Sequence, residues 1–172
     1  MNEVLNCLNT RRSCRSFQHR QVEEDALQQI LEAGLYAPAG KGKQSTAFVV
    51  VQDRETVEKL SRMNAAVLGG GGDPFFGAPT VIVVLADRSV GTCVEDGSVA
   101  LCNLMNAAHA LGLGSCWIHR AGPVFASEEG KEMLKKWGVE GDYIGVGHCI
   151  LGYRDGPEPV AAARREGRII RV

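Results

Sequence analysis

The sequence predicts one domain in which helices and strands alternate around a central sheet, of the α/β or α+β class. Three observations support this prediction. The chain has 172 residues, of which 45% are hydrophobic and 23% charged, as is ordinary for one globular domain. Amphipathic segments at helical spacing alternate with short runs of β-branched residues. Apart from one run of glycines, no segment resembles a linker or a repeat, so we expect residues 1–172 to form a single unit.

The first half of the chain predicts three helices and two strands. Acidic residues suit the first turn of the second helix, and Pro38 ends it. The first strand is a continuous β-branched run, which predicts burial on both of its faces. The glycines at 69–72 predict a surface loop. The expected helices cover residues 2–10, 22–36 and 54–63, and the expected strands cover 47–51 and 80–85.

The second half predicts two more helices and two more strands. A long helix carries a leucine stripe and several alanines that permit close packing. Ser127 is typical of a helix N-cap. The tail at 168–172 alternates charged and apolar residues and suits an edge strand, within the chain or added to a partner. The expected helices cover residues 95–111 and 127–137, and the expected strands cover 115–118 and 143–151.

Charge and hydropathy exclude several functions. Nineteen basic residues against 20 acidic ones leave a net charge of −1, which argues against nucleic-acid or anionic-membrane binding. The longest apolar runs are far shorter than the roughly 20 residues that a membrane-spanning helix needs. The chain begins Met-Asn-Glu without a basic and apolar leader, so we expect a cytoplasmic protein.

Six scattered cysteines predict reduced, mostly buried thiols rather than disulfides, because no Cys-x-x-Cys pair occurs. A zinc site built from Cys116, His119, His148 and Cys149 is disfavoured. In strands, residues that are adjacent or three apart point to opposite faces. We therefore expect no metal site.

The arginines are concentrated at the two ends of the chain. The first 20 and the last nine residues hold eight of the 13 arginines. One interpretation is two solvated basic ends. The other is that both ends converge on a polyanionic ligand, because arginine forms paired hydrogen bonds with phosphate. The spacing within 10–17, with three arginines and a serine beside Phe17, favours a ligand with a phosphate and a polar ring.

This stretch resembles the FMN-binding opening of the nitroreductase family. Further segments resemble that family in the same order along nearly the whole chain. These segments are 37–51, 77–84, 96–119 and 151–165. The resemblance implies an α+β fold whose central sheet is mixed, mainly antiparallel and flanked by helices.

The resemblance also implies a set of FMN-binding residues. The phosphate and ribityl end would be held from both chain ends, and Arg15 would reach the N1/O2 edge of the flavin. Backbone N–H groups of His119 and Arg120 would face flavin N5 and O4. The loop at 38–44 would come from the partner subunit. The implied residues are Arg11, Arg12, Ser13, Arg15, Pro38, Ala39, Gly40, Gln44, Ile118, His119, Arg120, Arg164 and Arg165.

The implied function is an FMN-dependent oxidoreductase, active as a homodimer with FMN at the interface. Hydride from NADH or NADPH would pass to flavin N5, and a second substrate, such as a nitroaromatic or a quinone, would then be reduced in a ping-pong reaction. The cofactor carries this chemistry, so we assign no catalytic side chain. Ala162 stands where many members of the family carry a lysine. The chain is also too short for the larger helical insertion that covers the flavin in the family. These departures leave a flavin-binding sensor or storage protein as the alternative.

Overall fold

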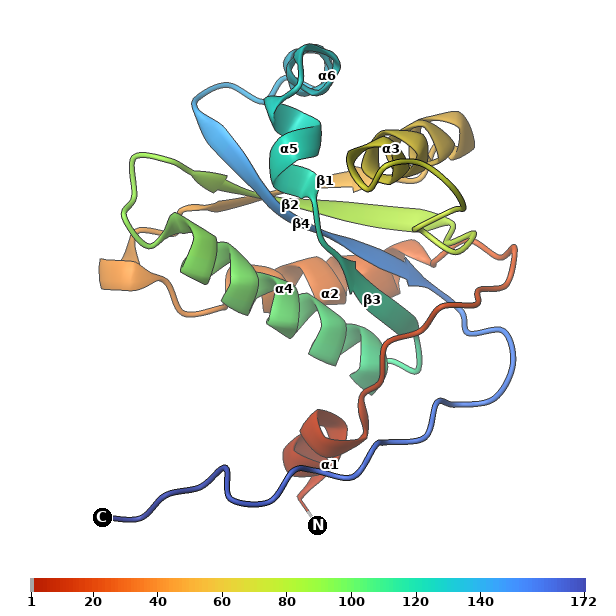
Figure 1. Ribbon diagram of the computed structural model, residues 1–172, viewed down its shortest axis with the longest axis vertical. Helices are drawn as coiled ribbons and strands as arrows, with labels where there is room; N and C mark the ends of the chain where they lie inside the picture. The colour runs from red at the N-terminus through yellow and green to blue at the C-terminus, as the bar shows by residue number, and fades with distance from the viewer. Residues whose placement is uncertain (1) are drawn as a thin grey trace.

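The two longest strands of the chain, β2 and β4, form the centre of a four-stranded sheet with the order β1-β2-β4-β3. The computed structural model describes residues 2–172 (Figure 1). All strand pairs in the sheet are antiparallel, so the fold is α+β as predicted. The strands are β1 (Thr46–Val51), β2 (Thr80–Asp87), β3 (Gly114–Ile118) and β4 (Tyr143–Gly152). The helices are α1 (Glu3–Thr10), α2 (Glu24–Leu35), the 3-10 turn η1 (Gly40–Gly42), α3 (Arg54–Val67), α4 (Cys93–Ala110), α5 (Ala121–Ala126) and α6 (Glu128–Lys136).

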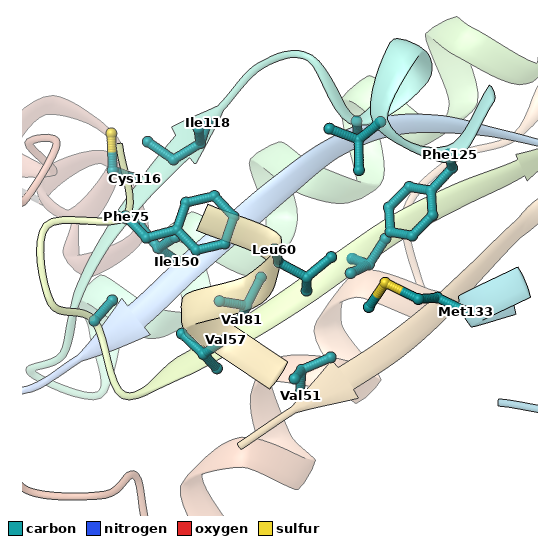
Figure 2. Packing of buried hydrophobic residues seen from close by; sticks show 14 of the residues in the cluster. Val51, Val57, Leu60, Phe75, Val81, Cys116, Ile118, Phe125, Met133 and Ile150 are labelled. Carbon is teal, nitrogen blue, oxygen red and sulfur yellow. The ribbon is translucent and has the colours of Figure 1, made fainter. Parts of the chain in front are cut away.

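The sheet separates two helical layers, with α2 and α4 on one face and α3, α5 and α6 on the other (Figure 1). Side chains of β2 alternate between them: Val81 and Val83 face the α3 layer, whereas Ile82 faces α4. Figure 2 shows the hydrophobic core on the α3 side of the sheet, in which Leu60 and Phe125 pack against the strands.

Strand β1 is an edge strand, and the prediction that both of its faces are buried is wrong. It pairs only with β2, and most of its side chains are only partly buried. Val50 is 36% exposed, whereas every residue of β2 before Asp87 is buried. A run of valines predicts a strand in either position, because its local pattern does not record how many neighbours the strand has.

Helix α4 packs closely on the sheet because small residues lie at the contact. A Cβ atom at Gly97 would lie 2.6 Å from Val146, and one at Gly147 would lie 2.6 Å from Leu101 Cδ1 on α4. The predicted cap at Ser127 is confirmed, since its Oγ accepts a hydrogen bond from Gly130 N at 3.1 Å. The short helix α5 was not predicted, because a six-residue segment with Gly122 and proline inside it carries turn signals.

The two ends of the chain contribute little to the core. Helix α1 has no buried residue, and Val4, Leu5 and Leu8 are exposed. After Arg154 the chain continues as an extended, exposed tail that runs past α1 (Figure 1). This tail, residues 155–172, forms no strand within the described chain, so its pairing with a partner stays a prediction.

Three further features bear on function. No helix of residues 2–172 is long and apolar enough to cross a membrane. All six cysteines are free, and three of them (Cys14, Cys116 and Cys149) are buried, fewer than the expected majority. Within the described residues, no three His, Cys, Asp or Glu side chains are grouped so that they could hold a metal ion.

Candidate functional site

The arginine-rich segment after α1 lies along the free edge of β3. Ser13 forms a parallel bridge with Ser115, and Cys14 N donates to Ser115 O at 2.9 Å. Close approach depends on Gly114, because a Cβ atom there would lie 2.7 Å from Cys14 Sγ. The buried Phe17 then pairs with Arg154, just after β4. Residues 11–17 are therefore held at two points on the sheet edge.

The guanidinium groups of this segment differ in what they contact. Arg12 folds back on α1, where its Nη1 donates to Asn9 O at 3.0 Å and Arg11 O at 2.6 Å. Arg11 Nη1 is buried and has no hydrogen-bond partner among residues 2–172, and the same is true of Arg154 Nη1, although Arg154 Nη2 pairs with Glu158 Oε1 at 3.3 Å. Arg15 is exposed. Arg12 thus caps a helix, whereas Arg11 and Arg154 each hold one buried donor that lacks an acceptor.

These charges converge near the C-terminal end of α4. His109 Nε2 lies 2.8 Å from Thr10 Oγ1. Burial lowers the pKa of His109, Glu158 opposes this effect, and the charges of Arg154, Arg11 and Arg12 lower the pKa further. Unpaired buried guanidinium donors are costly, and a phosphate would supply the missing acceptors. The geometry therefore fits an anion at this end of the sheet.

The residues after β3 adopt an unusual backbone conformation. Arg120 has φ 75° and ψ 12°, a left-handed conformation that costs a residue other than glycine roughly 1–2 kcal/mol. The buried side chain of Asn64 contacts both His119 and Arg120, the two residues that follow β3. Its Nδ2 donates to His119 O at 2.7 Å, and its Oδ1 accepts from Arg120 Nε at 3.0 Å. Sequence reasoning missed Asn64, although a polar residue on the stripe of Val57 and Leu60 is a signal for it.

Behind Asn64 lies His148, which is fully buried on β4. Its ring packs between Phe75 and Phe125, with centroid distances of 5.2 and 5.9 Å. His148 Nδ1 lies 3.5 Å from Asn64 Nδ2. Burial lowers the pKa of His148 to about 4, against an ordinary value of 6.5, so the ring is neutral at pH 7.

The predicted loop at 38–44 lies at the opposite end of α4. The buried Asp96 carboxylate anchors it, accepting from Gly40 N at 2.9 Å and Ser45 Oγ at 2.8 Å. These hydrogen bonds lower the pKa of Asp96. Asp96 and His109 are 13 residues apart on one helix, a separation of roughly 20 Å at 1.5 Å per residue. Within one chain, the loop at 38–44 and the segment after α1 therefore lie at opposite ends of α4 (Figure 1).

The structure brings together only part of the predicted site. Residues 11–15 and 118–120 lie along and beyond the same edge strand, β3. Arg164 and Arg165 lie in the exposed tail, where the Arg164 guanidinium donates to Ala162 O at 2.8 Å. Arg154, which was not among the implied FMN-binding residues, is the arginine from this end of the chain that lies near His109 and Arg11.

A cavity of about 520 Å³ lies elsewhere, between α3 and the loop at 72–79. Several polar groups of its lining already have partners. Arg54 Nε lies 2.8 Å from Glu58 Oε1, and Asp73 accepts hydrogen bonds from Ser61 and from two backbone N–H groups. The arginine edge, with its unpaired buried donors, is therefore the stronger candidate site.

The fold is shared with a family of known proteins. The pattern of the Nitroreductase family matches residues 8–70 and 68–153, so the chain belongs to that family. A crystal structure of a nitroreductase with bound FMN from Bacteroides fragilis superposes with a TM-score of 0.92 at 28% identity, covering 100% of both chains.

Two curated relatives are similar over part of their length. One is a protein of Methanothermobacter thermautotrophicus with the provisional name NADH dehydrogenase/NAD(P)H nitroreductase, 36% identical over 119 residues. The other is an FMN reductase [NAD(P)H] of Bacillus subtilis, 30% identical over 138 residues. Each match covers 67% of this chain, but it spans only 60% of the first relative and 53% of the second.

Proposed function

We propose that this protein is an FMN-dependent oxidoreductase. It accepts hydride from NADH or NADPH and reduces a small electron acceptor, such as a nitroaromatic or a quinone, in a ping-pong reaction. The observation that carries the proposal is the buried, unpartnered Nη1 of Arg11, on the edge of a fold shared with an FMN-bound nitroreductase. A phosphate is the acceptor that this donor lacks.

The residues at the edge fit the parts of FMN. Arg11 and Ser13 would hold the phosphate and ribityl end, together with Arg154, because Arg11 and Arg154 each keep a buried donor without an acceptor. Arg15, further along the same segment, would reach the ring. Backbone N–H groups after Ile118 orient the ring. FMN supplies the hydride-accepting chemistry when it is bound. The chain binds and orients it and needs no acid or base of its own.

The test is anaerobic reduction of the FMN-loaded protein by NADH and by NADPH. We expect the flavin absorption band to bleach and to return when a nitroaromatic or a quinone is added. A protein that binds FMN but turns over no acceptor would instead be the sensor or storage protein. If millimolar NADH and NADPH both leave the band intact, the oxidoreductase assignment is wrong.

We also propose that the protein is a single-domain, cytoplasmic enzyme. Its six free thiols suit a reducing compartment.

We propose further that the site is completed by a second copy of the chain. The loop at 38–44 and the arginine edge lie at opposite ends of α4, so the loop meets FMN only if the partner supplies it. The exposed apolar residues of α1 and of the tail, including Leu5 and Ile169, give such a partner a surface to cover.

Complementation between two defective variants tests this arrangement. Arg11→Met damages the edge, and Gly40→Val displaces the loop, because a Cβ at Gly40 would lie 2.2 Å from Thr92 Oγ1. Each variant alone should bind FMN poorly. After the two are unfolded and refolded together, heterodimers should regain FMN, because one of their two sites combines an intact edge with an intact loop. FMN binding no better than that of the separate variants would show that edge and loop act within one chain.

Replacing Arg15 with alanine should lower the flavin reduction potential. Arg15 is assigned to the N1/O2 edge, where negative charge develops only on reduction, so its loss destabilises the reduced form more than the oxidised form. A loss of about 1.4 kcal/mol of differential stabilisation lowers a two-electron potential by roughly 30 mV. Redox titration of FMN-saturated parent and variant measures the shift. Equal potentials would place Arg15 away from the ring.

A further inference from the structure

We infer that Asn64 is a positioning residue, which sets the direction of the peptide N–H of Arg120 through its hold on His119 and Arg120. The inference rests on the proposed function in one respect, because the group that this N–H meets is the FMN ring. Asn64 itself is fully buried, on the inner face of α3, and acts through the residues it holds.

Both polar atoms of the Asn64 amide are used on two consecutive residues. Nδ2 donates to His119 O at 2.7 Å, and Oδ1 accepts from Arg120 Nε at 3.0 Å. One planar group thus fixes a backbone carbonyl and a side chain at once. A leucine in its place fills a similar volume but makes neither hydrogen bond.

The direction of the Arg120 N–H follows from peptide planarity. In a trans peptide the C=O of one residue and the N–H of the next point in opposite directions. The His119 carbonyl points at Asn64, toward the core, so the Arg120 N–H points away from Asn64. That is the direction that an edge-bound flavin needs if this N–H is to reach it.

The turn at Arg120 requires such a hold, because its φ of 75° is unfavourable for arginine. Close packing fixes the start of α5 just beyond it, since a Cβ at Gly145 would lie 2.5 Å from the Ala121 backbone. Without Asn64, the peptide before Arg120 is free to rotate toward ordinary φ values. The neutral His148 ring, between two phenylalanine rings, backs the Asn64 amide from the other side.

The test compares Asn64→Leu with Asn103→Leu. Asn103 Nδ2 also donates to a backbone carbonyl, Ala33 O at 3.0 Å, but this contact joins α4 to α2. Asn64→Leu should weaken FMN binding about five- to tenfold and shift the visible flavin spectrum. Asn103→Leu should lower thermal stability without either change. Adding Arg120→Gly to Asn64→Leu should restore part of the affinity, because glycine adopts positive φ without strain.

Amide hydrogen exchange in the FMN-free chain separates this inference from the proposed function. Asn64→Leu should speed exchange in the segment 120–124, where Val124 N donates to Arg120 O at 3.1 Å, whether or not the parent binds FMN. If Asn64→Leu does not fold, Asn64→Asp is used, because it keeps an acceptor for Arg120 and sets an oxygen against His119 O. Exchange, affinity and spectrum all equal to those of the parent would overturn the inference. If the parent never binds FMN but exchange is still faster in Asn64→Leu, only the proposed function is wrong and the inference about Asn64 holds.

Discussion

Replacing Arg11 with methionine should weaken FMN binding by roughly tenfold to a hundredfold, without destabilising the FMN-free chain. Methionine keeps most of the length of the arginine side chain but removes its charge. In the free protein the buried Nη1 has no partner, so its removal costs no hydrogen bond and relieves a desolvated donor. In the complex the same donor faces phosphate, and a charge-assisted hydrogen bond contributes about 1.5–3 kcal/mol.

Two measurements on the same variant check this expectation. Fluorescence titration with FMN gives the dissociation constant, and urea unfolding of the FMN-free protein gives the free energy of unfolding. Arg12→Met is the matched comparison, since its guanidinium donates to Asn9 O and Arg11 O at the end of α1. It should lower stability by about 1 kcal/mol and change FMN affinity less. If Arg11→Met destabilises the FMN-free chain and leaves FMN binding intact, Arg11 is structural and the phosphate lies elsewhere.

Because His148 is buried as a neutral ring, the protein should be about 2 kcal/mol less stable at pH 5 than at pH 7. Burial lowers its pKa from 6.5 to about 4. As the pH falls below 6.5, the unfolded chain binds a proton on this ring that the folded chain does not. The free energy of unfolding therefore decreases through this interval and levels off below about pH 4, where both states are protonated.

Urea unfolding of the parent and of His148→Gln at pH 7 and pH 5 measures this dependence. Glutamine does not titrate, so the variant should be less stable at pH 7 but lose about 2 kcal/mol less on acidification. Phe125→Leu is the control for packing, because it removes a ring beside His148 and leaves the titrating group in place. Identical losses in the parent and in His148→Gln would show that the imidazole is accessible to water in the fold.

The same buried imidazole shows why part of the site escaped prediction. His148 and Cys149 were considered as metal ligands, and strand alternation argued against a shared site. In the structure, His148 instead packs behind the side-chain amide of Asn64, which is 84 residues away in the sequence. A helical stripe that reads Val57, Leu60, Asn64 shows that a polar group is buried, but it does not show what that group contacts.

The sequence by itself determined most of the helices and strands and the family, because helical and strand periodicities and helix caps are local. It also determined that arginines crowd the segment after α1. The tertiary structure alone decided that β1 is an edge strand and that α5 exists. It also decided that Arg12 caps α1 while Arg11 and Arg154 keep unpaired buried donors, and that Asn64 holds the turn at Arg120. These outcomes depend on which distant segments pack together, and burial and hydrogen bonding across such contacts are properties of the folded chain rather than of any local pattern.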